Sequence, residues 1–281
     1  MYNEYYNFGG LTLRLTGETP WESAKVCAPF RIEPGPVEHT IHIALCDAVP
    51  APPPDAIRHA CTARWRADGC AYIHSRCDDR YTAFAVTEGS HTHVRLTRAY
   101  AAHLSARTIL ESAGVFDILA AHAMLVLHSS YIITAQGSAL LFSGPSGIGK
   151  STQAALWCDH AGAHIVNGDR TLVRVDHATA NGIFYAGTSG ISHNETAPLR
   201  AIVLLGQAAE NRIRRPRPQQ AFAGVLHQCA YYEWDAASAV RMTELAAQLV
   251  SRVPVLCFDC RCDASAVRAL QAYLEEEKNG I

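Results

Sequence analysis

Lysine is scarce in this chain of 281 residues: only three of its 24 basic residues are lysines, and the others are arginines. Charged residues of both signs make up 18% of the chain, and the formal net charge is only −2. This balance gives no electrostatic reason to expect a nucleic acid or an anionic membrane as a partner. The hydrophobic content of 49% excludes a largely disordered chain and is typical of a folded globular protein.

No targeting or membrane-spanning segment is apparent in the sequence. The first residues, Met1–Tyr6, lack the basic and apolar regions of a signal peptide. The richest apolar stretch, 116–127, contains Asp117 and His122 and is too short to cross a bilayer. We therefore expect a cytoplasmic protein that has no membrane as a partner.

Cysteine is more frequent, with ten residues, but it forms only one cluster, at Cys257, Cys260 and Cys262. No second pair of ligands stands at the spacing of a zinc site, so we expect reduced thiols in the core or on the surface. His91 and His93 fall on one face of an alternating segment. Two histidines alone are a weak ligand signal, and we interpret them as solvent-facing strand residues.

The chain contains one complete phosphate-binding signature, G-x-x-x-x-G-K-[ST]. In such a loop, glycines let the backbone curl so that its N–H groups surround anionic oxygens, and the following helix adds the positive end of its dipole. Lys150 would hold the outer phosphates, and the Ser151 hydroxyl would bind Mg²⁺. The predicted nucleotide-binding residues are Gly144, Pro145, Ser146, Gly147, Ile148, Gly149, Lys150, Ser151 and Thr152.

The residues on either side of this signature have the expected character. The apolar run 139–142 predicts a buried strand before the loop, and 152–157 predicts the first turns of a helix after it. Strand, glycine-rich loop and helix, in this order, are the context that the signature requires. The sequence therefore predicts a protein that binds a nucleoside triphosphate.

The pattern of apolar residues divides the chain between residues 104 and 105. Residues 1–104 predict a β-rich module without recognisable chemistry, because several segments alternate with a period of two: 11–15, 39–43, 82–86 and 93–96. Residues 105–281 predict an α/β nucleotide-binding domain, which makes the whole chain α+β. We expect helices at 106–124 (bent near Gly114), 236–252 and 265–277, and strands at 125–128, 131–133, 163–166, 182–185, 201–205 and 253–258.

A carboxylate, Asp169, follows the strand predicted directly after the phosphate-loop helix. The end of that strand is where a Mg²⁺ ligand is expected, bound directly or through water. P-loop NTPases usually place this acid much farther along the chain. The short interval between Lys150 and Asp169 therefore indicates a narrower class of P-loop proteins. The acid lies in the segment Asn167-Gly168-Asp169-Arg170, and His128 opens a predicted strand upstream.

These motifs resemble the HPr kinase/phosphorylase and phosphoenolpyruvate carboxykinase group, and more closely the bacterial HPr-kinase-like proteins of unassigned substrate. The resemblance covers about residues 105–275 and rests on blocks at 127–130, 142–147, 167–170, 187–192, 194–199 and 210–215. It implies a P-loop HPr-kinase-like domain in which a pair of aspartates holds the metal and acts as base toward an incoming hydroxyl.

The chain departs from that family pattern at Gly168, which stands where the first aspartate of the pair is expected. One interpretation is that Asp169 handles the metal while His128 assists proton transfer. In the other, the protein binds nucleotide without efficient chemistry, and His128 is an ordinary histidine at the end of a strand. The candidate catalytic residues are thus Asp169, His128 and Lys150, and the candidate metal ligands are Ser151 and Asp169.

Two further segments have open interpretations. The loop 187–190 consists of small residues that either close over phosphates with backbone donors or merely turn the chain. Arg212, Arg214 and Arg215 could clamp phosphoryl oxygens, but the neighbouring Pro216 and Pro218 favour a solvated loop.

Taken together, the sequence predicts an ATP- and Mg²⁺-dependent phosphotransferase, a kinase that acts on a hydroxyl of a peptide, a protein or a small molecule. The alternative is a non-catalytic nucleotide-binding accessory protein in a biosynthetic or maturation pathway. A carboxykinase is a weaker third option, because no basic pocket for two carboxylates is recognisable. The acceptor, the choice between ATP and GTP, and the oligomeric state stay open.

Overall fold

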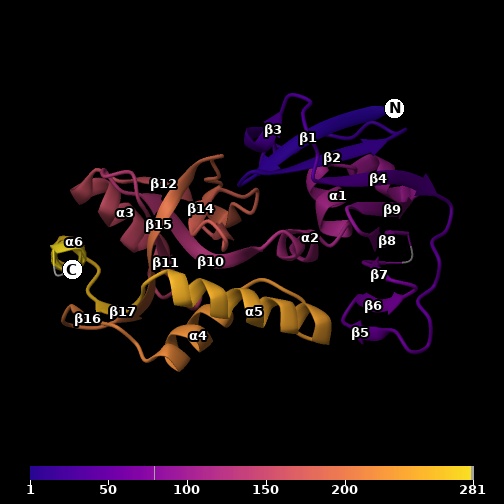
Figure 1. Cartoon of the computed structure of the whole chain (residues 1–281). Helices are drawn as coiled ribbons and strands as arrows, with labels where there is room; N and C mark the ends of the chain where they lie inside the picture. Colours follow the sequence, from indigo (N-terminus) through magenta and orange to yellow (C-terminus); the bar gives the residue numbers. More distant parts are fainter. Residues whose placement is uncertain (79, 280–281) are drawn as a thin grey trace. The chain divides into compact units, whose positions relative to one another are not determined.

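The computed structural model describes residues 1–78 and 80–279 (Figure 1). These residues form two compact units, which are described separately. The first unit contains the described residues of 1–122 together with the segment 232–239, and the second contains 123–231 and 240–279. The units therefore divide later in the chain than the predicted boundary between residues 104 and 105, and a short distant segment belongs to the first of them.

The first unit is built on a single sheet, with the strand order β3-β1-β2-β4-β9-β8-β7-β6-β5. Most neighbours are antiparallel, while β2–β4 and β4–β9 are parallel pairs. The β-rich character predicted for this region is confirmed. The strands are β1 (Tyr2–Phe8), β2 (Leu11–Gly17), β3 (Arg31–Ile32), β4 (His39–Cys46), β5 (Ile57–His59), β6 (Thr62–Ala67), β7 (Cys70–Arg76), β8 (Thr82–Glu88) and β9 (His91–Thr97).

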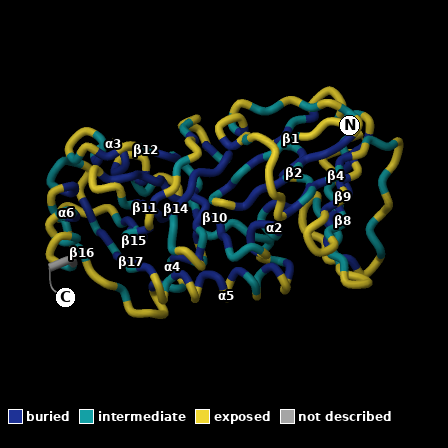
Figure 2. The backbone as a smooth tube through the Cα atoms, turned by 45° about the horizontal axis from the view of Figure 1, so that its top comes forward, coloured by how far each residue is buried: buried dark blue, intermediate teal, exposed yellow. Residues whose placement is uncertain are grey.

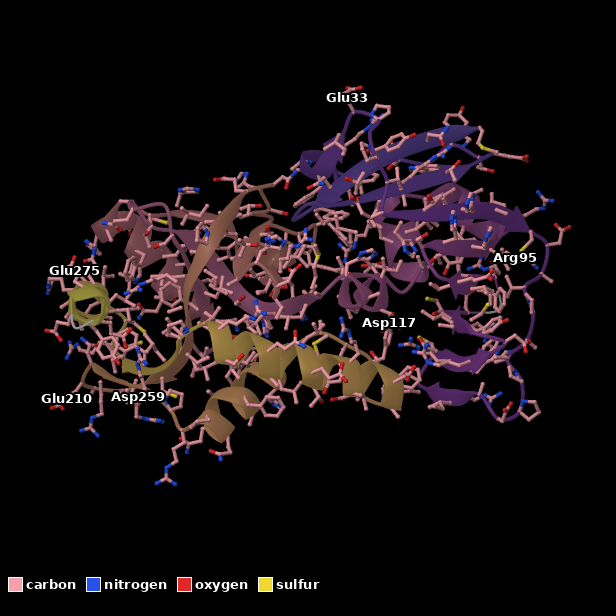
Figure 3. The ribbon with its side chains drawn as sticks, in the orientation of Figure 1. Glu33, Arg95, Asp117, Glu210, Asp259 and Glu275 are labelled. Carbon is pink, nitrogen blue, oxygen red and sulfur yellow. The ribbon has the colours of Figure 1, made fainter. Side chains whose placement is uncertain are left out.

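Alternation along β9 shows how this sheet separates core from solvent. Val94 and Leu96 are buried, whereas His91, His93 and Arg95 are exposed, as the alternation predicted (Figure 3 labels Arg95). Since successive strand residues point to opposite faces, one face of β9 packs into the core and the other faces water. The His93 ring stacks on that of His42 in the neighbouring strand, with centroids 4.8 Å apart.

Helices cover part of this sheet: η1 (Ala28–Phe30), η2 (Arg98–His103), α1 (Ala106–Ser112) and α2 (Val115–Ala121). The bend predicted near Gly114 is a complete break between α1 and α2. Gly114 has a φ of +73°, and a Cβ there would lie 2.2 Å from Ile73 Cδ1. Both the left-handed backbone and the close approach require glycine. The second helix ends at Ala121, slightly before the predicted end.

The second unit combines a mixed sheet with a small barrel. The strand order of the sheet is β11-β10-β13-β14-β15-β17-β16, and β12 also pairs with β10. Because β11 pairs with β15 as well, the five strands from β11 to β15 in this order close into a ring. The strands are β10 (Met124–Ile133), β11 (Ala139–Ser143), β12 (His164–Asn167), β13 (Arg170–Arg174), β14 (Thr179–Asn181), β15 (Thr196–Gln207), β16 (Arg212–Arg214) and β17 (Val255–Cys260).

Strand β15 lies at the centre of the second unit, because it pairs in parallel with β11 on one edge and with β17 on the other. Its residues Ala201, Ile202 and Val203 are fully buried, as the uniformly apolar run predicted (Figure 2). The helices that pack around this core are α3 (Lys150–Ala161), α4 (Pro218–Leu226), α5 (Ala236–Arg252) and α6 (Ala264–Asn279), with a 3₁₀ turn, η3 (Gly187–Ser189).

Three predictions of local structure are wrong. Residues 182–185 do not form a strand, because the Ile183 carbonyl accepts side-chain hydrogen bonds from Asn167 and Ser192 instead of joining a ladder. Residues 212–214 are a short edge strand, not a solvated loop, although the side chains of Arg212 and Arg214 are exposed. The two predicted strands around His128 are one continuous strand, β10, so His128 lies in its middle.

Candidate functional site

The loop with the phosphate-binding signature connects the end of β11 to the first residue of α3. Gly144, Gly147 and Gly149 have φ values of +142°, +79° and +110°, so the chain curls here in conformations that other residues rarely adopt. The sequence order strand, loop and helix is confirmed. Gln207 Nε2, at the end of β15, donates to the Gly147 carbonyl oxygen at 3.2 Å and supports the loop from outside.

Lys150 is almost completely buried at the base of this loop. Its Nζ donates hydrogen bonds to the carbonyl oxygens of Gly144, at 2.9 Å, and Pro145, at 3.0 Å. An ammonium group has three donors, so one N–H direction is left for another acceptor. Burial lowers the pKa of Lys150, and the nearby Asp169 carboxylate acts in the opposite direction.

Asp169 is placed by a turn that Asn167 builds between β12 and β13. Asn167 is fully buried, and its Oδ1 accepts hydrogen bonds from the backbone N–H groups of Asp169 and Arg170, both at 3.0 Å. The Asp169 carbonyl oxygen in turn accepts from the backbone N–H of Ser129 on β10, at 3.0 Å. The turn therefore fixes the Asp169 backbone beside the strand that carries His128. The role of Asn167 was not predicted from the sequence, although Asn-Gly is a turn signal.

His128 and Asp169 face each other, with His128 Nε2 and Asp169 Oδ1 3.5 Å apart. Arg170 Nε lies 3.5 Å from Asp169 Oδ2, so the carboxylate stands between an imidazole and a guanidinium. Burial lowers the pKa of His128, the positive charges of Lys150 and Arg170 lower it further, and Asp169 partly offsets them. The pKa shift favours the neutral imidazole.

The phosphate-binding loop and the pair His128 and Asp169 line one cavity of about 320 Å³. Gly144, Pro145 and Ile148 do not line it, and the first two act through their carbonyl bonds to Lys150. The residues that do line it are His128, Ser146, Gly147, Gly149, Lys150, Ser151, Thr152, Gly168, Asp169, Thr188 and Ser189.

The small-residue loop 187–190 forms one wall of this cavity through Thr188 and Ser189. Gly187 and Gly190 have φ values of +56° and +66°, and a Cβ on Gly187 would lie 2.5 Å from Asp169 Cβ. The loop therefore packs directly against the acid. The loop is a tight turn, as its positive-φ glycines indicate, and it also lines the cavity, so both sequence interpretations stay open.

A glutamine that the sequence reasoning did not single out, Gln228, supports His128. The backbone N–H of His128 donates to the Gln228 carbonyl oxygen at 2.8 Å, and its imidazole interacts with the Gln228 side chain. Gln228 is itself nearly buried and follows α4. Nothing in a single sequence links it to His128, because about one hundred residues separate the two.

The other predicted groups lie outside the cavity. Arg215 Nε pairs with Glu277 Oε1 at 2.8 Å on an exposed surface, and Arg212 and Arg214 do not line the cavity. The ten cysteines are free thiols, with Cys260 buried near Gln153. Within residues 1–78 and 80–279, no three histidine, cysteine or acidic side chains are grouped to hold a metal ion. Ser151 and Asp169 supply two oxygen ligands of the kind Mg²⁺ prefers, alongside phosphate oxygens.

No protein-family model matches the chain, and no curated protein matches it. The resemblance to HPr-kinase-like proteins therefore rests on the quoted motifs alone. Across the described ranges, no helix is both long enough and apolar enough to span a bilayer.

Proposed function

We propose that this protein is an ATP-dependent phosphotransferase that transfers the γ-phosphoryl group to a hydroxyl of a peptide, a protein or a small molecule. One observation carries the proposal: Lys150 and Ser151 at the start of α3, His128 on β10 and Asp169 between β12 and β13 come from three segments of the second unit and line the same cavity. Phosphoryl transfer needs positioned charges more than covalent chemistry, so a cavity with these groups has the required character.

Each group has a role that its surroundings support. Lys150 binds the outer phosphates with the donor that its two carbonyl bonds leave available. Ser151 and Asp169 bind Mg²⁺, which neutralises the charge on the phosphates. The glycine-rich turn exposes backbone N–H groups at the start of α3, where the helix dipole favours an anion.

His128 is the group best suited to accept a proton from the incoming hydroxyl. Its lowered pKa keeps the imidazole neutral, and only the neutral form can accept a proton. Asp169, 3.5 Å away, stabilises the imidazolium that results. This arrangement replaces the pair of aspartates that the family resemblance implies with a histidine and a single aspartate.

One observation favours the alternative, a non-catalytic nucleotide-binding protein. Gly168 supplies no second carboxylate, and Ser189 fills the adjoining space: a Cβ at position 168 would lie 2.3 Å from Ser189 Oγ. Asp169 is the only acid among the residues that line the cavity. A site with one acid binds Mg²⁺ and ATP but supplies less charge for the transfer step.

Nucleotide binding is tested by isothermal titration of Mg·ATP into the wild type, Lys150→Ala and Lys25→Ala. Lys25 is an exposed lysine of the first unit and gives a matched loss of charge. We expect Lys25→Ala to bind like the wild type and Lys150→Ala to bind about tenfold more weakly or worse. Equal affinities for all three proteins would remove nucleotide binding at this loop from the proposal.

Transfer is tested separately with γ-labelled ATP, by following release of phosphate and labelling of serine-containing peptides and polyols. Labelled acceptor or free phosphate, lost in Asp169→Asn, supports the phosphotransferase. Tight Mg·ATP binding with neither product supports the accessory protein instead.

A further inference from the structure

Hydroxyl side chains line the cavity that contains Lys150 and Asp169 from two different segments. Those of the glycine-rich loop and the first turn of α3 lie where the proposed function places the phosphates of ATP; they are Ser146, Ser151 and Thr152. The others, Thr188 and Ser189, belong to the loop 187–190, which packs against Asp169. In phosphoryl transfer the attacking and leaving oxygens are roughly in line, so the acceptor approaches from the side away from ADP. A hydroxyl outside the phosphate-binding loop is therefore the better acceptor.

The two hydroxyl groups of the loop 187–190 differ in their partners. Ser189 Oγ donates to the Ala186 carbonyl oxygen at 2.7 Å and accepts from the backbone N–H of Ile191 at 3.2 Å, which holds it in the turn. Thr188 is exposed and lines the cavity, and its side chain makes no hydrogen bond to any of residues 1–78 and 80–279. The proton and the lone pairs of the Thr188 hydroxyl are thus available for reaction.

The groups that would activate this hydroxyl line the same cavity. Asp169 packs against Gly187, the residue before Thr188, and its Oδ1 lies 3.5 Å from His128 Nε2. The lowered pKa of His128 favours the neutral imidazole, which can accept a proton. An unpaired hydroxyl, a base and an acid thus adjoin the proposed phosphate site.

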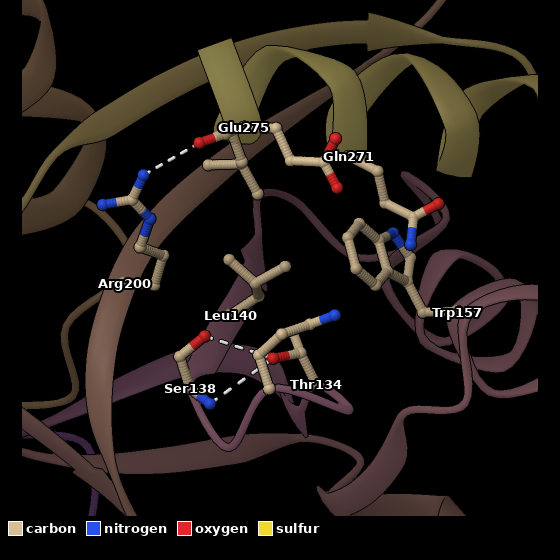
Figure 4. A pocket seen from close by; sticks show the side chains of 9 residues that line it. Thr134, Ser138, Leu140, Trp157, Arg200, Gln271 and Glu275 are labelled. Carbon is tan, nitrogen blue, oxygen red and sulfur yellow. Dashed lines mark hydrogen bonds between the residues drawn. The ribbon is translucent and has the colours of Figure 1, made fainter. Parts of the chain in front are cut away.

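A hydroxyl beside a cavity is not sufficient, as a second cavity of about 400 Å³ at the opposite end of β11 shows (Figure 4). Thr134 and Ser138 line it, but their hydroxyl groups are hydrogen-bonded to each other at 3.1 Å. Neither a histidine nor a residue of the glycine-rich loop is among the described residues that line this second cavity. Thr188 has both the unpaired hydroxyl and the neighbouring base that are missing there.

We propose that Thr188 is phosphorylated by the site of its own chain, an inference that rests on the proposed function. Thr188 Oγ1 forms a bond to the γ-phosphorus of ATP, and the bond from that phosphorus to the oxygen shared with the β-phosphate breaks. ADP leaves with that oxygen and the electron pair, and His128 accepts the hydroxyl proton. The new phosphate carries a charge of about −1.5 to −2 beside Asp169, so the modified chain binds Mg·ATP more weakly.

The test incubates the full chain with Mg·ATP and maps its peptides by mass spectrometry. We expect one phosphoryl group per chain, on Thr188, with a rate constant that does not change with protein concentration, because donor and acceptor belong to one chain. Thr188→Val should abolish this modification, and Thr188→Ser should retain it because it keeps the hydroxyl. Thr243→Val, an exposed threonine of α5 outside the cavity, should be modified like the wild type.

A second readout is the affinity of the purified, modified chain for Mg·ATP. Isothermal titration should show binding about tenfold weaker or worse than in the unmodified chain, because like charges oppose each other in the cavity. Released phosphate or a labelled external acceptor without modification of Thr188 would overturn the inference and leave the proposed function in place. If Mg·ATP binds but no modified chain, labelled acceptor or released phosphate forms, both the inference and the proposed function fail.

Discussion

Ser189 occupies the space into which any side chain at position 168 would have to project. A Cβ built on Gly168 lies 2.3 Å from Ser189 Oγ and 2.8 Å from Ser189 Cβ, closer than real Cβ contacts approach. The Ser189 hydroxyl is itself held, because it donates to the Ala186 carbonyl oxygen at 2.7 Å. Glycine at 168 and the tight loop 187–190 are therefore two parts of one packing arrangement.

We predict that Gly168→Ala lowers the free energy of unfolding by about 1–3 kcal/mol, the usual cost of overpacking. Adding Ser189→Gly should recover most of that loss, since it removes the atoms that the new methyl group meets. Urea titrations of the two single variants and the double variant measure this coupling. Gly35→Ala, where no atom lies within 4 Å of the added Cβ, is the control. Additive effects of the two substitutions would contradict the packing argument.

The catalytic proposal predicts that Asp169→Asn lowers turnover much more than it lowers affinity for Mg·ATP. Its carboxylate acts on the metal and on charge that develops during transfer, whereas Lys150 and the loop amides hold the ground-state nucleotide. Comparison of steady-state rates with calorimetric affinities separates the two effects. Asp176→Asn, an exposed acid outside the cavity, should match the wild type in both. Undiminished turnover of Asp169→Asn would exclude this acid from handling the metal.

Removal of the candidate base should have a smaller effect. We predict that His128→Ala lowers turnover by about 100-fold or less, which is the lower end of the typical contribution of general acid–base catalysis. Affinity for Mg·ATP should change little, since His128 is not part of the loop. A loss as large as that in Asp169→Asn would mean that His128 does more than accept a proton, and no loss would identify it as a structural histidine.

Much of the fold follows from local sequence patterns. Period-two alternation predicted β2, β4, β8 and β9, and uniform hydrophobicity predicted the buried centre of β15. Gly114 predicted the break between α1 and α2, because glycine adopts its φ of +73° without strain. These features depend on neighbours in the chain, which is the information that a single sequence contains.

The features that sequence reasoning missed depend on distant contacts. Residues 182–185 have the composition of a strand, but the buried amide of Asn167 takes the Ile183 carbonyl as its partner. The support of His128 by Gln228 and the packing of Ser189 on Gly168 also join residues far apart in the chain. The sequence therefore predicted the phosphate loop, Asp169 and His128 as parts of the candidate site. It did not predict the residues that hold them in place.

The buried histidine His39 should make stability depend on pH. Burial, followed by repulsion from His122 and His91, lowers the pKa of His39 from 6.5 to about 4. Between these two values the unfolded chain binds the proton and the folded chain does not. The contribution of His39 to stability is therefore fully present above the pKa that it has in the unfolded chain. It is lost as the pH falls toward the pKa that it has in the folded chain.

We predict that the protonation of His39 lowers the free energy of unfolding by at most about 3 kcal/mol between pH 7 and pH 4. Urea titrations of the wild type and His39→Gln at both pH values isolate this contribution from that of other groups. The variant should lose less stability on acidification, even if it starts lower because the contact between His39 Nε2 and Thr92 Oγ1 is removed. His160→Gln, an exposed histidine on α3, should behave like the wild type. Parallel losses in wild type and His39→Gln would show that His39 does not titrate as described.

Arg64 should be among the most sensitive positions of the first unit. Its side chain is only 2% exposed, pairs with Asp117 (labelled in Figure 3) and has Nε 3.1 Å from Asp235 Oδ2. The guanidinium also lies over the Tyr232 ring, 4.0 Å from its centroid. These contacts tie the distant segment 232–239 to the sheet of residues 1–122. Without the arginine, Asp235 would remain buried without its positive partner.

We predict that Arg64→Leu lowers the free energy of unfolding by about 3–5 kcal/mol, because breaking a buried ion pair leaves an uncompensated charge. Arg66→Leu, two residues along the same strand at an exposed position, should change it by less than about 0.5 kcal/mol. Urea titration followed by circular dichroism compares the two variants. If Arg64→Leu does not fold, Asp235→Asn should still show a clear loss, since it weakens the same pair while keeping the shape of the side chain. Equal stabilities of the Arg64 and Arg66 variants would mean that the buried pair contributes nothing to holding this segment.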